Sequence, residues 1–233
     1  MKNPTIAYLA LGSNQGDKLQ FLQKAVRAIF KKIGEITAVS SIYKTPALGF
    51  EGEDFLNACL AVKTRFSAEQ TLTKLLEIED VLGRRRTNSE VYENRVIDLD
   101  LIFFENEIIS SEKLVVPHPR MQERKFVLFP LEDIAGTFQH PVLKKTVNQL
   151  TEETRDNSEI EKTTGKLEIP KQQLNSYNYL AIEGNIGAGK TSLVTMISQD
   201  FKAKLITERF KDNPFLPKFY KDQARYAFPL EMS

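Results

Sequence analysis

Two aspartates, Asp98 and Asp100, lie within a run of Val, Ile, Leu and Phe that is typical of an interior strand. Side chains alternate between the faces of a strand, so both carboxylates are expected on one face, with positions 97, 99, 101 and 103 on the other. Two neighbouring carboxylates repel each other and lose hydration, so the pair requires a neutralising cation. Mg²⁺ with a bound phosphate meets this requirement, because the ion takes carboxylate oxygens and keeps coordination positions for phosphate.

Arginine side chains offer an alternative way to neutralise this pair. Several arginines lie just upstream in the sequence: Arg84, Arg85, Arg86 and Arg95. They do not decide between the two interpretations, because arginine also binds phosphate in a bidentate manner. Short motifs have many chance matches, so the two aspartates alone leave both a metal site and a purely structural pair open.

The composition is that of an ordinary globular protein and argues against several functional classes. The 233 residues are 41% hydrophobic and 27% charged, and this length suits one large domain or one medium domain with part of another. A net charge of +1 gives no electrostatic reason to expect binding to nucleic acid or to a membrane surface. No apolar run reaches the roughly 18 residues of a membrane span and no signal-peptide segment is evident, so we expect a cytoplasmic protein.

The single cysteine, Cys59, lies in an alternating apolar run. This setting predicts packing within a sheet rather than a nucleophile. A lone cysteine also excludes an intrachain disulfide framework.

The first 150 residues alternate between strand and helix patterns. Besides the strand that carries the aspartates, strands are expected at 5–11, 36–43 and 55–66. Helices are expected after the N-cap Asp17 and after the capping box of Ser67 and Gln70. Because the strands do not follow a strict parallel βαβ repeat, this pattern predicts an α+β sandwich over one sheet, in a domain of residues 1–150.

A polar stretch at 151–177 predicts a solvated linker, and residues 178–233 begin a different pattern. An apolar strand at 179–183 leads into a complete P-loop motif, whose residues are Gly184, Gly187, Gly189, Lys190 and Thr191. A helix is expected directly afterwards, which is the context that the motif requires. Backbone amides of such a loop cradle phosphates, while Lys190 would reach the terminal phosphates and Thr191 would bind Mg²⁺. These features predict a P-loop α/β segment with a parallel sheet.

Several motifs in the first domain, taken together, resemble one enzyme family. They are Leu11-Gly12-Ser13-Asn14, Tyr43-Lys44-Thr45-Pro46, Phe55-Leu56-Asn57-Ala58, Arg95-Val96-Ile97-Asp98-Leu99-Asp100 and Val116-Pro117-His118. In this order and spacing, residues from about 4 to 150 resemble 6-hydroxymethyl-7,8-dihydropterin pyrophosphokinase of the folate pathway. The resemblance implies a ferredoxin-like α+β fold. It also implies an enzyme that transfers the pyrophosphoryl group of ATP to a pterin hydroxymethyl group and releases AMP.

The same resemblance implies roles for individual residues. Asp98 and Asp100 match the ligands of two Mg²⁺ ions. Arg86 and Arg95 match arginines that hold phosphate and stabilise the transition state. A further set matches the ATP site: Glu79, Arg84, Tyr92, His118 and Arg124. Another set matches the pterin pocket: Thr45, Pro46, Leu48, Phe55, Asn57 and Phe126.

The chemistry of the reaction is consistent with these residue types. Phosphoryl transfer requires in-line positioning and neutralisation of phosphate charge, which Mg²⁺ and arginines provide. A flat pterin suits two aromatic faces with an amide at its edge, although core packing is the alternative for Phe55 and Phe126. The sequence departs from the family in a segment and at a single residue. Tyr92-Glu93-Asn94 replaces a common Trp-Gly-Pro, and Lys113 stands where arginine is frequent. No residue is assigned as a general base.

The last part of the chain resembles the deoxynucleoside kinases. The resemblance rests on the P-loop region, on Glu208-Arg209-Phe210 with Asn213-Pro214-Phe215, and on the run at 225–229. Glu208 matches a glutamate that contacts the sugar hydroxyl in that family. Only the family's N-terminal part is covered, so we expect no kinase activity from this segment. One alternative is a deoxynucleoside kinase whose first domain is a nucleotide-binding module, and another is a non-catalytic scaffold.

Overall fold

The computed structural model describes residues 3–47, 52–84, 94–170, 179–184, 188–206, 221, 222 and 225. The chain divides into two units, Met1–Pro170 and Lys171–Ser233. The first unit contains the sheet and the cavity described below, and the second contains the P-loop motif.

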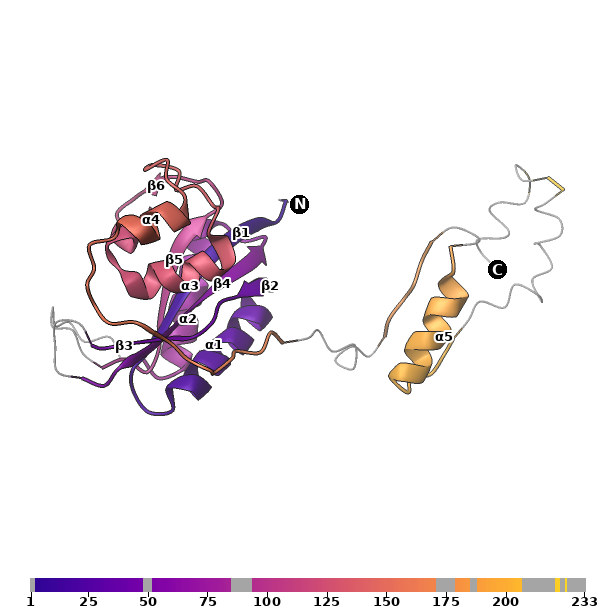
Figure 1. Cartoon of the computed structure of the whole chain (residues 1–233). Helices are drawn as coiled ribbons and strands as arrows, with labels where there is room; N and C mark the ends of the chain where they lie inside the picture. Colours follow the sequence, from indigo (N-terminus) through magenta and orange to yellow (C-terminus); the bar gives the residue numbers. More distant parts are fainter. Residues whose placement is uncertain are drawn as a thin grey trace. The chain divides into compact units, whose positions relative to one another are not determined.

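One antiparallel sheet is the framework of the first unit (Figure 1). Its strands are β1 (Thr5–Ser13), β2 (Gly34–Val39), β3 (Tyr43–Thr45), β4 (Phe55–Thr64), β5 (Asp98–Phe104) and β8 (Glu161–Lys162). They follow the order β5-β1-β4-β3-β8, and β2 also pairs with β4. A separate hairpin consists of β6 (Ile109–Ser110) and β7 (Val115–Val116). An antiparallel sheet with packed helices agrees with the α+β class expected from the sequence.

Helices cover both faces of this sheet (Figure 1). They are α1 (Lys18–Lys32), α2 (Ala68–Val81), the short 3₁₀ helix η1 (Met121–Glu123), α3 (Lys125–Ala135) and α4 (Val147–Glu153). Leu9 of β1 and Leu75 of α2 belong to the core beneath α1 and α2. Cys59 of β4 and Leu131 of α3 belong to a second core beneath α3 and α4. Two apolar faces of one sheet therefore produce a helix–sheet–helix arrangement.

The local signals in the sequence are confirmed at three positions. The Asp17 side chain accepts a 3.0 Å hydrogen bond from the backbone N–H of Gln20 at the start of α1. Ser67 and Gln70 form the expected capping box of α2. Cys59 is fully buried in the sheet, and burial raises the pKa of its thiol, so it is an inert packing residue.

Phe103 differs from the expected alternation of β5. Strict alternation places Phe103 on the face opposite Asp98 and Asp100, but it packs in the core beneath α3 and α4. The reason is an irregularity in the β1–β5 pair, whose register shifts between Tyr8 and Leu9. A bulge of this kind inserts one residue and turns the following side chains to the other face. The two aspartates precede the shift and keep a common face.

The stretch 151–170 also differs from the solvated linker expected there. α4 continues to Glu153, and β8 pairs with Tyr43 and Lys44 of β3. Leu167 is only 8% exposed and belongs to the core beneath α1 and α2. Backbone pairing and one buried leucine attach this stretch to the first unit. Because its other residues are mostly polar, the composition alone predicted a linker.

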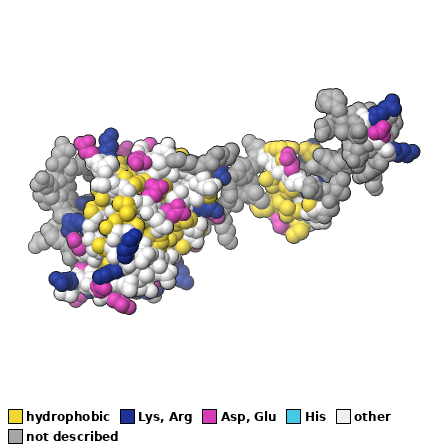
Figure 2. Space-filling view, turned by 90° about the horizontal axis from the view of Figure 1, so that it is seen from above, with side chains coloured by type: hydrophobic (Ala, Val, Ile, Leu, Met, Phe, Trp, Pro, Cys, Tyr) yellow, Lys and Arg dark blue, Asp and Glu magenta, His cyan; other side chains and the backbone are white. Residues whose placement is uncertain are grey.

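In the second unit, α5 (Lys190–Asp200) begins within the P-loop motif. Gly189, at φ 77°, is its N-cap and has the left-handed conformation that glycine adopts most easily. The strand expected at 179–183 is not formed, since residues 179–184 have no regular structure. Hydrophobic side chains gather on α5 (Figure 2), where Leu193 and Met196 are 48% and 60% exposed. None of the helices in the described part of the chain has both the length and the apolar character of a membrane-spanning segment.

Candidate active site

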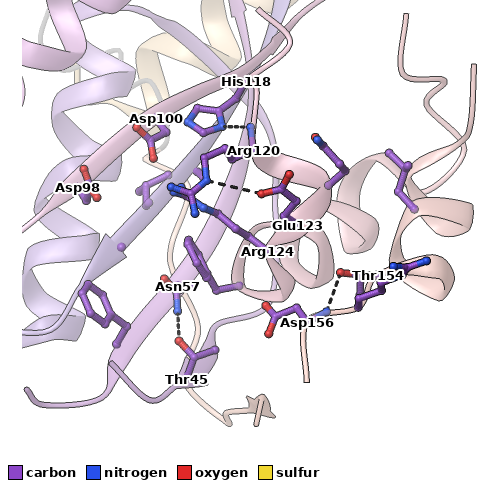
Figure 3. Close-up of a pocket in the computed structure, with 18 of the residues that line it drawn as sticks. Thr45, Asn57, Asp98, Asp100, His118, Arg120, Glu123, Arg124, Thr154 and Asp156 are labelled. Atoms are coloured by element: carbon purple, nitrogen blue, oxygen red, sulfur yellow. Dashed lines mark hydrogen bonds and ion pairs between the residues drawn. The ribbon is translucent and has the colours of Figure 1, made fainter. Parts of the chain in front are cut away.

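One cavity of the first unit collects most of the predicted site residues (Figure 3). It has a volume of about 1080 Å³ and is lined from β1, β3, β4 and β5, from the segment around η1, and from the end of α4. The predicted residues that line it are Thr45, Pro46, Phe55, Asn57, Arg84, Arg95, Asp98, Asp100, His118, Arg124 and Phe126. The sheet therefore brings the expected nucleotide and pterin residues to one place.

Gly12 of β1 forms part of the lining between these two groups of residues. It pairs with Asn57 of β4 on one side and with Asp98 of β5 on the other. A Cβ atom at Gly12 would lie 3.2 Å from Oδ1 of Asn57 and 3.9 Å from Cβ of Asp98. Any side chain at this position would crowd the amide, so glycine keeps the space between the amide and the acidic pair.

Asp98 is bound by arginines. Arg84 donates to its Oδ1 and Arg95 donates to its Oδ2. Arg84 also forms an ion pair with Glu79. Burial alone would lower the pKa of Arg84, but the carboxylates of Asp98 and Glu79 outweigh burial and raise it. The arginine neutralisation that the sequence left open is thus present at Asp98.

Glu79 of α2 is buried behind this ion-pair network and is only 1% exposed. Its Oε1 accepts a 2.8 Å hydrogen bond from the backbone N–H of Leu99, the residue between the two aspartates. A buried carboxylate requires such partners. Glu79 therefore fixes the acidic end of β5, and it is not among the residues that line the cavity.

Asp100 has a different environment from Asp98. Burial and the neighbouring Asp98 carboxylate raise its pKa to about 7, although Arg124 acts in the opposite direction. Two carboxylates on one strand face, beside a cavity that can admit a triphosphate, fit the ligand set of Mg²⁺. Among the described residues, no three His, Cys, Asp or Glu side chains form a metal-binding group. An ion here would therefore need phosphate or water oxygens as well, as Mg²⁺ commonly does.

His118 and Arg124 lie on the wall next to Asp100 (Figure 3). The backbone N–H of His118 donates to the Ile102 carbonyl at 2.9 Å, and its Nδ1 accepts from the Arg120 N–H at 3.3 Å. Burial and the Arg124 guanidinium lower the pKa of His118, while Asp98 acts in the opposite direction. The imidazole is therefore neutral near pH 7, and the arginines supply the positive charge on this wall.

The part of the cavity wall on the β4 side of Gly12 carries the amide, and aromatic rings line the same cavity. Asn57 is 4% exposed, and its Nδ2 donates a 2.9 Å hydrogen bond to Oγ1 of Thr45. This bond joins β4 to β3 and fixes the orientation of the amide (Figure 3). Phe55 and Phe126 line the same cavity, and the Arg124 guanidinium carbon lies 5.5 Å from the centre of the Phe126 ring. Phe126 also packs against the core beneath α3, so pocket lining and core packing are both present.

Some predicted residues lie outside the described part of the chain. They are Leu48, Arg86, Tyr92, Gly187 and Glu208. In the second unit, the described P-loop residues are Gly184, Gly189, Lys190 and Thr191. The Lys190 ammonium donates a hydrogen bond to the Gly184 carbonyl, so both ends of the motif are in contact.

Sequence reasoning missed one wall of the cavity. The residues concerned are Arg120, Gln122, Glu123, Leu143, Lys145, Leu150, Glu153, Thr154, Arg155 and Asp156. A local sequence signal could have predicted α4, which contributes to this wall, because Thr146 and Gln149 form a capping box at its start. No local signal pointed to Asp156, because its partner, the Lys125 N–H, lies 31 residues away in the sequence.

Comparison with known proteins identifies the family of the first unit. Residues 8–136 match the family model described as 7,8-dihydro-6-hydroxymethylpterin-pyrophosphokinase (HPPK). The chain belongs to the HPPK family. The matched range contains the acidic pair, His118, Arg124 and Phe126, but it ends before α4 and the residues that follow it.

Two bacterial relatives illustrate the extent of the match. A 2-amino-4-hydroxy-6-hydroxymethyldihydropteridine pyrophosphokinase of Bacillus subtilis is 45% identical over 132 residues, covering 55% of this chain and 77% of the relative. The enzyme of the same name from Aquifex aeolicus is 33% identical over 147 residues, covering 63% of this chain and 90% of the relative. A longer relative, the folic acid synthesis protein fol1 of Pneumocystis carinii, is 37% identical, and the match covers 64% of this chain and 20% of that protein.

Solved structures support the same fold. The Plasmodium falciparum HPPK-DHPS wild-type structure matches with a TM-score of 0.52 at 18% identity, covering 65% of this chain and 45% of that chain. At this identity the likeness concerns the fold alone. Separately, residues 180–233 match the deoxynucleoside kinase family model.

Proposed function

We infer that this chain transfers the pyrophosphoryl group of ATP to 6-hydroxymethyl-7,8-dihydropterin, forming the pterin diphosphate and AMP in folate biosynthesis. As a member of the HPPK family, it is an ATP-dependent pyrophosphokinase and therefore a transferase. The observation that carries this function is the cavity that joins an acidic pair and arginines to an aromatic pocket within the matched residues.

The acidic end of the cavity would hold the nucleotide phosphates. Asp98 and Asp100 would bind the two Mg²⁺ ions that the family resemblance implies, and these ions would neutralise phosphate charge when bound. The oxygens of Asp98 that would bind Mg²⁺ accept hydrogen bonds from Arg84 and Arg95 in this structure. Arg95 also lines the cavity, where it would contact the transferred group, and Arg86 is proposed for the same role.

Further nucleotide contacts are proposed from the places of the residues in the cavity wall and in the family motifs. Arg124 and the neutral His118 extend from the wall beside Asp100, where they can orient phosphate oxygens. Tyr92 is proposed as a further ATP contact. Glu79 acts indirectly, because its bonds hold Arg84 and the backbone of Leu99.

The part of the cavity beside Asn57 would hold the pterin. The Asn57 amide, oriented by Thr45, is suited to the hydrogen-bonding edge of the ring. Phe55 and Phe126 are proposed to pack on its two faces. Pro46 lines the same cavity, and Leu48 is proposed to complete the pterin pocket.

We propose that residues 178–233 are the N-terminal part of a deoxynucleoside kinase domain, joined to the pyrophosphokinase unit. The family match and the helix that begins at Lys190 support this assignment. No residue of α5 is buried and residues 179–184 form no strand, so we expect no deoxynucleoside phosphorylation by this chain. A cytoplasmic location and the absence of a nucleic-acid partner remain predictions from the composition.

Product analysis tests these assignments directly. The purified chain is incubated with Mg-ATP and 6-hydroxymethyl-7,8-dihydropterin, and separately with deoxynucleosides, and AMP and ADP are quantified. Pterin-dependent AMP is the expected product. Deoxynucleoside-dependent ADP without AMP would contradict the proposal and would identify the second unit as the active one.

A further inference from the structure

A strap of residues 154–170 follows α4 and crosses the first unit to α1 (Figure 1, orange). It is attached at three places. Asp156 binds the start of α3, β8 pairs with β3, and Glu168 exchanges hydrogen bonds of 2.8 and 2.9 Å with the side chain of Gln23 in α1. Leu167 is buried beside this last contact. The strap is therefore a fixed part of the unit.

The contact of the strap with α3 is a charged hydrogen bond at a helix N-terminus. Oδ2 of Asp156 accepts a 2.8 Å hydrogen bond from the backbone N–H of Lys125, the first residue of α3. Oδ1 accepts a 2.9 Å hydrogen bond from the N–H of Ser158, which fixes the carboxylate within the strap. The Lys125 ammonium also reaches the Ser158 carbonyl at 3.4 Å.

The start of α3 lacks a cap from its own sequence. Arg124 is the N-cap residue, and its side chain makes no capping hydrogen bond. The first free N–H groups of a helix require acceptors, and a carboxylate there also interacts favourably with the helix dipole. Asp156, from a distant part of the chain, supplies an acceptor for one of these N–H groups and a negative charge near the helix N-terminus. It therefore replaces a local N-cap.

The residue that Asp156 holds lies between two proposed substrate contacts. Arg124 and Phe126 flank Lys125, and the Arg124 guanidinium lies 5.5 Å from the centre of the Phe126 ring. Both side chains line the cavity, and so does Asp156 (Figure 3). A change in the backbone at Lys125 would therefore move the phosphate-binding and pterin-binding side chains together.

We propose that Asp156 is a positioning residue for the pyrophosphokinase reaction, which acts by holding the first turn of α3 so that Arg124 and Phe126 face their substrates. This inference rests on the proposed function of the same cavity. It adds a residue beyond the range matched by the family model, which ends at residue 136. Asp156 has no contact with the acidic pair and takes no part in the chemistry.

The protonation state of Asp156 is consistent with this role. Burial raises the pKa of the carboxyl, but hydrogen bonds from Ser158 and Lys125 outweigh burial and lower it. The group is therefore ionised near pH 7 and can accept both hydrogen bonds.

The test compares Asp156→Ala, Asp156→Asn and a control, Glu159→Ala, in the full chain. Asparagine keeps one side-chain oxygen that can accept from Lys125, whereas alanine keeps none. Glu159 is an exposed carboxylate of the same strap, so its variant controls for lost charge. The kcat and KM for Mg-ATP and for 6-hydroxymethyl-7,8-dihydropterin are measured well below the lowest melting temperature, together with amide hydrogen exchange at residues 125–128.

We expect Asp156→Ala to lower kcat/KM for the pterin about tenfold, within the ~100-fold that a 1 Å misplacement can cost. Asp156→Asn should recover most of this loss, Glu159→Ala should match the parent, and exchange at 125–128 should accelerate in the alanine variant alone. Unchanged kinetic constants in Asp156→Ala would overturn the proposal, and so would equal losses in Asp156→Ala and Glu159→Ala.

The same measurements separate this inference from the proposed function. If the parent chain forms no pterin-dependent AMP, the proposed function fails. In that case, unchanged amide hydrogen exchange at 125–128 in Asp156→Ala would also overturn the positioning role. Faster amide exchange there would support the contact by which Asp156 stabilises the start of α3.

Discussion

The side chain of Asn14 holds the backbone of Arg95. The Arg95 N–H donates a 2.6 Å hydrogen bond to Oδ1 of Asn14, and the Asn14 N–H donates a 3.0 Å bond to the Arg95 carbonyl. Asn14 is fully buried at the end of β1, and its Nδ2 also donates to the Asn94 side chain at 2.7 Å. An arginine proposed to contact the transferred group is thus anchored through its backbone to the end of β1, while its guanidinium is paired with Asp98.

Replacement of Asn14 should therefore reduce catalysis through Arg95. Asn14→Ala removes the acceptor for the Arg95 N–H, and we expect kcat to fall at least tenfold while stability falls by about 1–3 kcal/mol, the cost of an unpaired buried polar group. Asn14→Asp keeps the acceptor and should retain more activity. Steady-state kinetics and thermal melting check both, with the exposed neighbour Gln15→Ala as a control. If kcat in Asn14→Ala equals that of the control, Arg95 does not depend on this anchor.

Removal of the Asp98 carboxylate should abolish turnover and leave the fold intact. Arg84 keeps Glu79 as a partner in Asp98→Ala, so the ion-pair network is not left uncompensated. We expect activity to fall by more than the ~10–100-fold that loss of a metal's outer-shell partner costs. Circular dichroism and kinetics at several Mg²⁺ concentrations check this, with the exposed Asp80→Ala as a control. Turnover that survives in Asp98→Ala would rule out the metal assignment.

Chelation provides a second check on the same site. EDTA should abolish pterin-dependent AMP formation by the parent chain, and excess Mg²⁺ should restore it, because the phosphate charge has to be neutralised for transfer. Excess Mg²⁺ should not restore Asp98→Ala. Activity that persists in EDTA would show that the arginines alone neutralise the phosphates.

The hydrogen bond between Thr45 and Asn57 should contribute to pterin binding but not to ATP binding. Thr45→Val keeps the shape of the side chain and removes the acceptor of the Asn57 amide, which leaves a buried N–H unpaired. We expect the KM for the pterin to rise about tenfold, corresponding to ~1.4 kcal/mol, with an unchanged KM for ATP. Thr45→Ser keeps the hydroxyl and is the matched control. An equal pterin KM in the valine and serine variants would exclude this role of the bond.

Sequence reasoning succeeded where the determining interactions are local. The cap at Asp17 and the capping box at Ser67 depend on residues three positions apart, so the starts of α1 and α2 could be predicted. The strand pattern likewise placed Asp98 and Asp100 on one face of β5. The cavity residues were found because motifs on separate strands resemble a single family, and the family match supports that resemblance.

Prediction was wrong where the determining partner is remote in the sequence. The face of Phe103 depends on a register shift between β5 and β1, which no residue of β5 reveals by itself. The packing of β8 on β3 uses backbone groups of a polar stretch, so composition carries no signal for it. Sequence reasoning also missed two hydrogen bonds between distant residues. The Leu99 N–H donates to Glu79, 20 positions away, and the Lys125 N–H at the start of α3 donates to Asp156, 31 positions away.

Truncated chains test whether the strap belongs to the first unit. A chain that ends at Pro170 keeps the strap, whereas one that ends at Glu153 loses Asp156, β8 and Leu167. Burial of a leucine side chain alone is worth about 1.5–3 kcal/mol. We therefore expect the 1–170 chain to match the full chain in melting temperature and pterin-dependent AMP formation, and the 1–153 chain to melt lower and lose activity. Equal stability and activity of the two truncated chains would show that the residues after Glu153 act only as a linker, as their composition suggests.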